Sequence, residues 1–299
     1  MSRDNNNQAK AIIAAIIATV IWGFSFMVTS IALNHTSVEM LISVRFIASF
    51  LIILILTILG AGKIDLKGKP LGLFILMGLC EPVVYFIAET NGIKYTTSSF
   101  SGLMISLIPV ATALLSVVII HEHLSLKRFL WIMLSVAGVV IISVDQTGQG
   151  AISLKGIIYL IVTIISASLF SILSRKISTQ FTSFERTFVM MLMGCIAFTG
   201  NAIIHEKSHF ISGFTAAVTN EYVMLPVVFL SLFCSVIAFF CMNYSMTYLE
   251  VNRAVIFTNI TPVISVIAGV TLLGEPFSII LVIGIILILT GVYMVNKVS

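Results

Sequence analysis

The sequence predicts an all-α integral membrane protein, with ten transmembrane helices arranged as two inverted five-helix repeats. Its 299 residues are 59% hydrophobic and only 9% charged, whereas an ordinary soluble domain carries roughly 25% charged residues. The mean hydropathy is +1.15. The apolar residues form long runs with short polar breaks, and the second half of the chain repeats features of the first. A soluble fold could not bury this much apolar surface.

The apolar runs are long enough to cross a bilayer. About 30 Å of hydrocarbon requires about 20 predominantly apolar residues, because each residue adds about 1.5 Å to a helix. The first run is too long for a signal-peptide core and precedes no small-residue cleavage site, so we expect a retained helix. The ten segments that qualify are residues 11–33, 37–60, 71–91, 97–121, 125–144, 155–175, 184–204, 223–248, 253–273 and 277–296.

The basic residues lie mainly in alternate loops, and this asymmetry predicts the orientation of the chain. With the N-terminus inside, twelve of the 16 Lys and Arg residues are cytoplasmic, three are outside, and Arg45 lies within a span. We therefore expect a multi-pass protein of the cell (inner) membrane with both termini in the cytoplasm. The expected partners are the lipid bilayer and a small-molecule substrate. The net charge of +4 is too small to indicate nucleic-acid binding.

An internal repeat divides the chain into residues 1–148 and 149–299. A spacing of 153 residues is shared by Pro109 and Pro262, Glu122 and Glu275, Ser125 and Ser278, and Gly138 and Gly291. Each half holds five predicted helices, so the second copy enters the membrane from the opposite side. Inverted repeats are typical of secondary transporters, which bind substrate near the bilayer midplane between the repeats. A duplicated scaffold that transports nothing is the alternative, because a fold does not establish a function.

Several local patterns accompany the repeat. They are Trp22 with Gly23, Arg45 with Phe46, a Pro followed by a Glu in the fourth and ninth spans, and Gly138 with Gly291. Together with the duplication and the length, these patterns resemble the EamA family of the drug/metabolite transporter superfamily over nearly the whole chain. The resemblance implies a bundle in which spans 1, 3, 4, 6, 8 and 9 surround a central cavity, with spans 5 and 10 at one edge. It also implies transport of amino acids or other small metabolites, often outward.

Two ionisable side chains, Arg45 and Glu81, fall well inside apolar spans, where an unpaired charge costs several kcal/mol. They have similar expected depths on successive helices, so one interpretation is a structural ion pair. The other is functional: Arg45 attracts a substrate carboxylate or phosphate, and Glu81 carries a coupling proton, since apolar surroundings favour a neutral carboxyl group. Tyr85 and Glu89 share the helix face of Glu81. We expect this face to point into the bundle, with Glu89 near enough to the outer surface to be solvated.

A proline deep inside a helix removes a backbone hydrogen bond and frees a carbonyl oxygen. Pro82, Pro109 and Pro262 fall inside predicted helices and are therefore candidate kinks or hinges. For each one alone, a kink that only shapes the packing is an equally good interpretation. The symmetric placement of Pro109 and Pro262 in the two repeats favours a functional role, such as that of a hinge.

The other candidate substrate contacts are polar or aromatic residues. Asn243, Tyr244 and Asn259 are the best polar candidates in the second half. Trp22, near the middle of the first span, is a candidate cavity wall, although core packing explains it as well. Glu275, like its repeat partner Glu122, is expected to cap the helix that follows it, because a helix N-terminus favours negative charge.

A membrane enzyme is the main rival to a transporter, and the sequence offers no catalytic constellation for one. All three aspartates and all five histidines lie in or beside predicted loops or the leader, which leaves no buried partner for a serine nucleophile. The HExxH and Walker patterns are absent from the sequence. We therefore predict a non-enzymatic carrier without a metal or cofactor. The resemblance to the EamA family implies that it moves an amino acid or a related zwitterionic or amphipathic solute, outward. A passive facilitator or channel is the alternative.

Overall fold

The computed structural model describes residues 2–69, 71–120, 125–148, 151–177, 179–249, 257 and 260–297. All regular elements within these residues are helices, so the expected all-α fold is confirmed. Among the described residues, seven helices are long and apolar enough to cross a membrane, and three shorter apolar helices accompany them.

The helices of the first half follow the predicted spans closely. In chain order they are α1 (Ser2–Leu33), α2 (Val38–Ile58), α3 (Leu71–Gly78), the π-helix η1 (Leu79–Val84), α4 (Tyr85–Lys94), α5 (Ser98–Ile105), α6 (Ile108–Ile120) and α7 (Leu126–Gly148). The third predicted span thus consists of α3, η1 and α4, and the fourth consists of α5 and α6.

The second half contains one helix that we did not expect. Its elements are α8 (Leu154–Ile177), α9 (Ser183–Glu206), η2 (Lys207–His209), α10 (Phe210–Thr219), α11 (Glu221–Val228), the π-helix η3 (Phe229–Ala238), α12 (Phe239–Tyr248), α14 (Ile260–Leu273) and α15 (Ile279–Lys297). The stretch 205–221 was expected to be a break between spans, but it holds α10. Phe210, Phe214 and Ala217 recur along one face of α10 and pack on a buried apolar cluster, which explains why this stretch is helical.

Several helices begin at side-chain caps that the sequence supplies. The Ser37 hydroxyl accepts a hydrogen bond from the Met40 amide at the start of α2. At α9, Thr182 and Glu185 form a capping box, in which each side chain bonds to the backbone of the other. The Lys69 ammonium also donates to both carboxylate oxygens of Glu185 at 2.8 Å. This ion pair fastens the loop after α2 to the start of α9.

The prolines interrupt helices more strongly than a simple kink would. Glu81 has extended backbone angles, φ −142° and ψ 116°, because a residue that precedes proline avoids the α conformation. The helix therefore breaks at Glu81 rather than bending at Pro82. Pro109 lies in the first turn of α6, after the chain has left α5. Pro262 likewise lies in the first turn of α14.

Glu275 does not cap the helix that follows it, so that prediction is wrong. Its two carboxylate oxygens accept hydrogen bonds from the backbone amides of Ser98 and Ser99, at 2.7 and 2.9 Å, at the start of α5. Ser278 caps α15 instead, accepting from the Leu281 amide. Packing of α5 against α14 brings the loop after α14 close to the N-terminus of α5. The repeat partner of Glu275, Glu122, lies outside the described residues.

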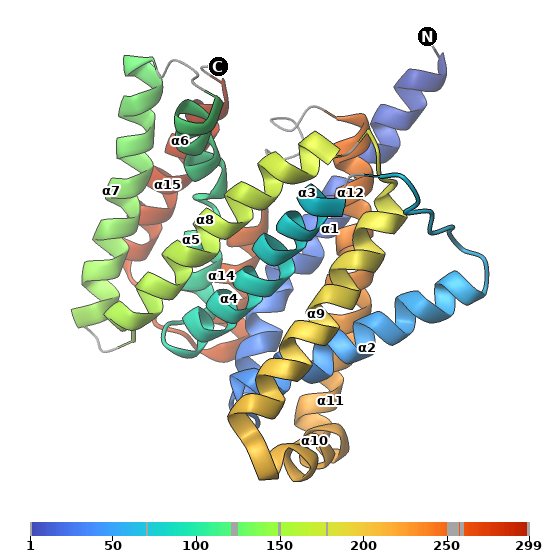
Figure 1. Cartoon of the computed structure of the whole chain (residues 1–299). Coiled ribbons are helices and arrows are strands. Elements are labelled where there is room, and N and C mark those ends of the chain that lie inside the picture. The colour runs from blue at the N-terminus through green and yellow to red at the C-terminus, as the bar shows by residue number, and fades with distance from the viewer. Residues whose placement is uncertain are drawn as a thin grey trace.

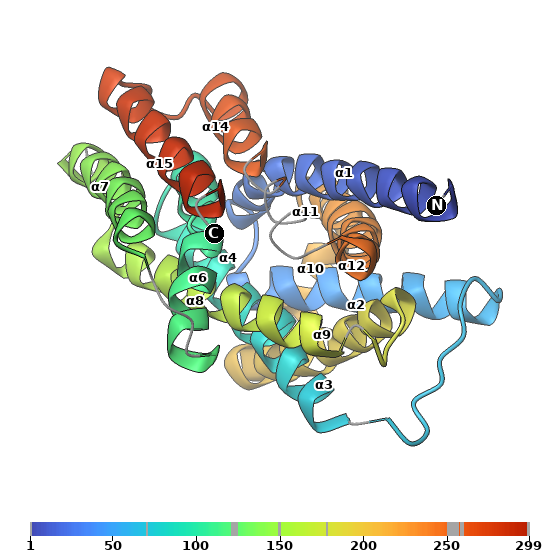
Figure 2. The ribbon, with the colours of Figure 1, turned by 90° about the horizontal axis from the view of Figure 1, so that it is seen from above.

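Two helices stand apart from the rest of the bundle. Figures 1 and 2 show α7 and α15 side by side at one edge, while α1, α2, α9 and α12 lie together on the other side. A Cβ added to Gly138 would lie 2.7 Å from the carbonyl oxygen of Gly284. A Cβ on Gly291 would lie 2.7 Å from the carbonyl oxygen of Trp131. Small residues thus allow α7 and α15 to approach closely, as is common in membrane helix pairs.

Replacing Gly138 with leucine is expected to destabilise the protein by about 1–3 kcal/mol, the usual cost of overpacking, because the new side chain meets backbone rather than a movable side chain. Thermal unfolding in detergent would measure the change. Gly200→Leu is the matched control, since a Cβ at Gly200 would have no atom within 4 Å. Equal losses in the two variants would contradict close packing of α7 on α15.

Candidate functional site

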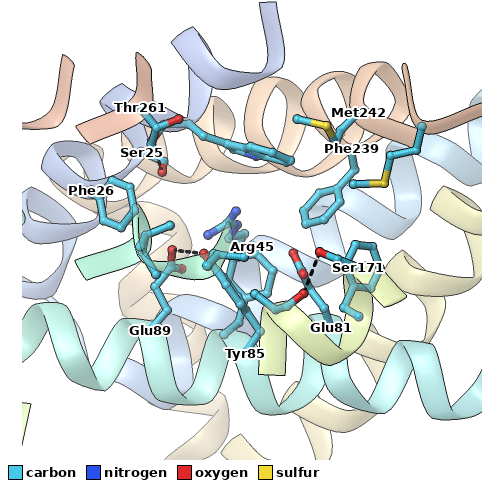
Figure 3. Close-up of a pocket in the computed structure, with 17 residues that line it drawn as sticks. Ser25, Phe26, Arg45, Glu81, Tyr85, Glu89, Ser171, Phe239, Met242 and Thr261 are labelled. Carbon is cyan, nitrogen blue, oxygen red and sulfur yellow. Dashed lines mark hydrogen bonds between the residues drawn. The ribbon is translucent and has the colours of Figure 1, made fainter. Parts of the chain in front are cut away.

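A cavity lies at the centre of the bundle, between helices of both halves (Figure 3). Its volume is about 90 Å³, several times the roughly 10–15 Å³ that one buried water requires. It is therefore large enough to admit more than a single solvent molecule. The lining residues are Trp22, Ser25, Phe26, Arg45, Glu81, Tyr85, Phe86, Glu89, Ile105, Ile108, Ala167, Phe170, Ser171, Phe239, Met242, Met246 and Thr261.

Arg45 supplies a positive charge to the cavity from α2. Its side chain is only 3% exposed, and its Nε donates a hydrogen bond to the Ser235 hydroxyl at 3.0 Å. The guanidinium carbon lies 4.4 Å from the centre of the Phe86 ring, within the range of a cation–π contact. One nitrogen and one face of the guanidinium are therefore held by neighbouring helices.

Two carboxyl groups flank Arg45, and Figure 3 shows Glu89 on one side and Glu81 on the other. Glu89 is 5% exposed and accepts a hydrogen bond from the Tyr85 hydroxyl at 2.9 Å. It is buried in the bundle, as expected for its helix face, so the alternative of a solvated Glu89 does not hold. Glu81 is 7% exposed, and the residues that the structure describes include no hydrogen-bond or ion-pair partner for its carboxyl group.

The ion pair considered between Arg45 and Glu81 is not formed within the described part of the chain. The Arg45 guanidinium is held by Ser235 of η3 and by the ring of Phe86 of α4. Glu81 instead projects from the break in the third span, which turns its backbone out of the helical path. The two side chains therefore face the same cavity without neutralising one another by direct contact.

The break at Glu81 also exposes backbone, and a neighbouring helix satisfies it. The Ser166 hydroxyl on α8 donates to the Cys80 carbonyl oxygen at 2.6 Å. Non-helical backbone at membrane depth is tolerated where protein or cavity water supplies such partners. The serines of α8 thus do more than allow close packing, since Ser166 stabilises the segment that presents Glu81 to the cavity.

The opposite wall of the cavity is aromatic and sulfur-containing. Trp22 packs edge-on against Phe239, with ring centres 5.3 Å apart, and its indole nitrogen donates to the Cys234 carbonyl oxygen at 3.2 Å. Met242 and Met246 on α12 continue this wall, as Figure 3 shows for Met242. Trp22 therefore packs in the interior and also lines the cavity, so core packing and a place in the cavity wall both describe this residue.

The polar candidates of the second half do not meet the cavity. Asn243 is buried, but its amide donates to the Thr187 hydroxyl at 3.1 Å, and it is not among the lining residues. Tyr244 packs against Tyr248, with ring centres 4.8 Å apart, and also lies outside the lining. Both point away from the cavity because α12 directs Met242 and Met246 toward it. Asn259 lies outside the described residues.

Arg186 is a buried cation near the start of the seventh predicted span, and its burial was not expected from the sequence. It is fully buried in the first turns of α9. It donates to the Ser174 hydroxyl at 3.1 Å, and to the Asn243 carbonyl and the Thr247 hydroxyl at 2.8 Å each. These bonds join α9 to α8 and α12. Arg186 lies four residues after the N-cap Thr182, so the sequence places it inside the helix. Nothing in the sequence indicates that its side chain is buried.

The cavity combines three charged or ionisable groups with an apolar wall. Arg45 matches an anionic group, the carboxyl groups match a cationic group or a proton, and the aromatic and methionine side chains match an apolar moiety. The sequence identified Trp22, Arg45, Glu81 and Tyr85 as candidates, and all four line the cavity. Ser171 and Thr261, also in the lining, carry no sequence signal that separates them from packing residues.

Comparison with known proteins adds a family and a fold. A model of the EamA-like transporter family matches residues 9–144 and 154–297. The "Uncharacterized transporter YcxC" of Bacillus subtilis (strain 168) is 25% identical over 289 residues, which cover 96% of this chain and 93% of that protein. An "Uncharacterized transporter" of Archaeoglobus fulgidus is 24% identical over 288 residues, covering 96% and 99%.

A solved structure resembles the whole fold. One crystal structure superposes with a TM-score of 0.70 over 97% of this chain and 98% of its own, at 18% sequence identity. At this level of identity the likeness concerns the fold alone.

Proposed function

The chain belongs to the EamA-like transporter family, and on that premise we propose that this membrane transporter is a secondary carrier whose substrate binds in the cavity beside Arg45. The proposed cargo is an amino acid or a related zwitterionic or amphipathic solute, moved outward by alternating access. The observation that carries this proposal is the composition of the cavity, in which buried guanidinium and carboxyl groups face a wall of aromatic and methionine side chains.

The charges in the cavity support a zwitterion over a polyanion. Arg45 is the one Lys or Arg residue among the lining residues, so it can balance one carboxylate but not several phosphate charges. The two carboxyl groups of the lining, Glu81 and Glu89, also disfavour a solute with several negative charges. The apolar wall suits the remaining side chain of the solute. A sugar phosphate would leave most of its charge unbalanced, which is costly in a buried site.

We further propose that ten spans form two inverted repeats, residues 1–148 and 149–299. The two separate matches to the family model, at 9–144 and 154–297, support this division. The π-helices support it as well, because η1 and η3 occupy the third predicted span of each half. Alternating access would then exchange the conformations of the two halves. The breaks at Pro82, Pro109 and Pro262 are proposed hinges, since the residues beside them line the cavity.

The proposed location is the cell membrane, with both termini in the cytoplasm. The distribution of Lys and Arg among the loops supports this orientation. The proposed partners are the bilayer and the transported solute, with no nucleic acid. No cofactor is proposed, and Glu81 is the proposed carrier of a coupling proton.

Counterflow in liposomes tests the function. The purified protein would be reconstituted in vesicles loaded with unlabelled solute and screened against labelled amino acids and small metabolites. A carrier gives saturable accumulation of the matching label, whereas a channel gives equilibration without counterflow. Protein-free vesicles are the control. Uptake of no solute across the panel would favour a non-transporting scaffold, and non-saturable flux would favour a channel.

A further inference from the structure

The π-helix η3 holds two side chains of the cavity that come from other helices. Its Ser235 hydroxyl accepts the hydrogen bond from Arg45 Nε at 3.0 Å. The adjacent Cys234 carbonyl oxygen accepts the bond from the Trp22 indole at 3.2 Å. A π-helix offsets its carbonyls from the regular i−4 pattern, and such segments are frequent at functional sites. One short segment thus orients both the charged and the aromatic part of the cavity.

The bond to Ser235 leaves the terminal nitrogens of Arg45 for the cavity. A guanidinium has five N–H donors in a planar fork, and its two terminal nitrogens can bind both oxygens of one carboxylate. Here Nε is used by Ser235, and two rings lie against the guanidinium, whose carbon is 4.4 Å from the centre of Phe86 and 5.6 Å from that of Phe46. No carboxylate within the described residues lies within ion-pair distance of Arg45. The Glu89 carboxyl group, which also lines the cavity, accepts its hydrogen bond from Tyr85.

We propose that Ser235 is a positioning residue that makes the cavity select solutes carrying a carboxylate, by holding Arg45 with its terminal nitrogens toward the substrate. This inference rests on the proposed carrier function and goes beyond it, because it names the group that is recognised and the residue that enforces the choice. Ser235 itself acts through Arg45 and need not contact the solute. A long arginine side chain has many rotamers, and the hydroxyl selects one of them before substrate binds.

Ser231 provides a matched control within the same π-helix. It is buried like Ser235, but its hydroxyl donates only to the Val228 carbonyl oxygen of its own helix, at 3.4 Å. Removing that hydroxyl therefore alters the same segment without touching the Arg45 guanidinium. A general effect of disturbing η3 should be shared by both serines, whereas a positioning effect should belong to Ser235 alone.

The experiment measures counterflow with the neutral L-amino acids and their C-terminal amides as probes. Wild type, Ser235→Ala, Ser235→Thr and Ser231→Ala would be compared in the same liposomes. In Ser235→Ala we expect the half-saturating concentration of the carboxylate probe to rise about tenfold, the scale of one hydrogen bond to a charged group. The maximal rate and the response to the amide should stay unchanged. Ser235→Thr should restore the preference, and Ser231→Ala should resemble wild type.

The possible outcomes separate this inference from the function on which it rests. If wild type exchanges none of the probes, the proposed amino-acid carrier is overturned, and the inference with it. If wild type prefers carboxylate over amide and Ser235→Ala keeps that preference in full, only the role of Ser235 is overturned. Losses shared equally by Ser231→Ala and Ser235→Ala would also overturn it, since they would show a general packing effect. Matching thermal unfolding midpoints would establish that the variants are folded.

Discussion

Arg45→Ala is expected to weaken substrate binding by roughly 10- to 150-fold. Hydrogen bonds to charged groups contribute about 1.5–3 kcal/mol, and each 1.4 kcal/mol corresponds to roughly a factor of ten. Arg45 is the one Lys or Arg residue that lines the cavity, so no neighbouring lysine or arginine of the lining can replace it. The half-saturating concentration in counterflow, measured for the solute that wild type exchanges best, would report the change.

Two controls separate lost binding from lost folding in the Arg45 experiment. Arg45→Lys keeps the charge but loses the planar fork and the bond to Ser235, so it should give an intermediate value. Arg186→Lys changes a second buried arginine of the described residues, which bonds to Ser174, Asn243 and Thr247 away from the cavity lining. It is expected to lower stability without altering solute preference. An unchanged half-saturating concentration in a folded Arg45→Ala variant would contradict the proposed binding site.

Glu81→Gln is expected to abolish accumulation driven by a pH gradient while leaving solute exchange in place. Glutamine has nearly the same shape as a protonated glutamate but cannot release a proton. Glu81 is buried at the break in the third span and has no partner among the residues that the structure describes. With one proton exchanged per solute, a gradient of one pH unit would support roughly tenfold accumulation. The variant should lose this accumulation and retain counterflow.

Glu89→Gln is the matched control for Glu81. It removes the other carboxyl group of the cavity but keeps an oxygen to accept the bond from Tyr85. We expect Glu89→Gln to preserve the response to the pH gradient. Accumulation that is unchanged in a transporting Glu81→Gln variant would rule out Glu81 as the proton carrier. If Glu89→Gln alone loses the accumulation driven by the pH gradient, Glu89 rather than Glu81 is the proton carrier.

The charged residues of the cavity were the easiest part of the site to predict from the sequence. A buried charge is costly in an apolar span, so Arg45 and Glu81 stand out in the sequence without any structure. Glu89 was placed on the correct helix face, with solvation left as an alternative, because distance from the end of a span does not report burial. Trp22 and Tyr85 were found by depth and by helix spacing. Of the seven candidate substrate contacts, Trp22, Arg45, Glu81 and Tyr85 line the cavity, Asn243 and Tyr244 do not, and Asn259 lies outside the described residues.

Contacts between distant segments were beyond prediction. Glu275 binds the backbone of α5, about 177 residues earlier, and no local pattern shows that. Arg186 lies near the cytoplasmic end of a predicted span, yet three acceptors from α8 and α12 surround it. Asn243 was chosen for its polarity, but it serves Thr187 and Arg186. In each case the partner is set by how the helices pack, and hydropathy along the chain contains no information about that packing.

The amino-acid sequence was sufficient to predict an all-helical membrane protein, most helix positions and the costly charges within the spans. These follow from interactions between near neighbours and from transfer of side chains into hydrocarbon, both of which depend on local composition. Which of those charges share a cavity, and which hydroxyl orients Arg45, depends on the tertiary arrangement of α2, η1 and η3. That arrangement is determined by long-range packing, because bonds such as Arg45 to Ser235 join residues 190 positions apart.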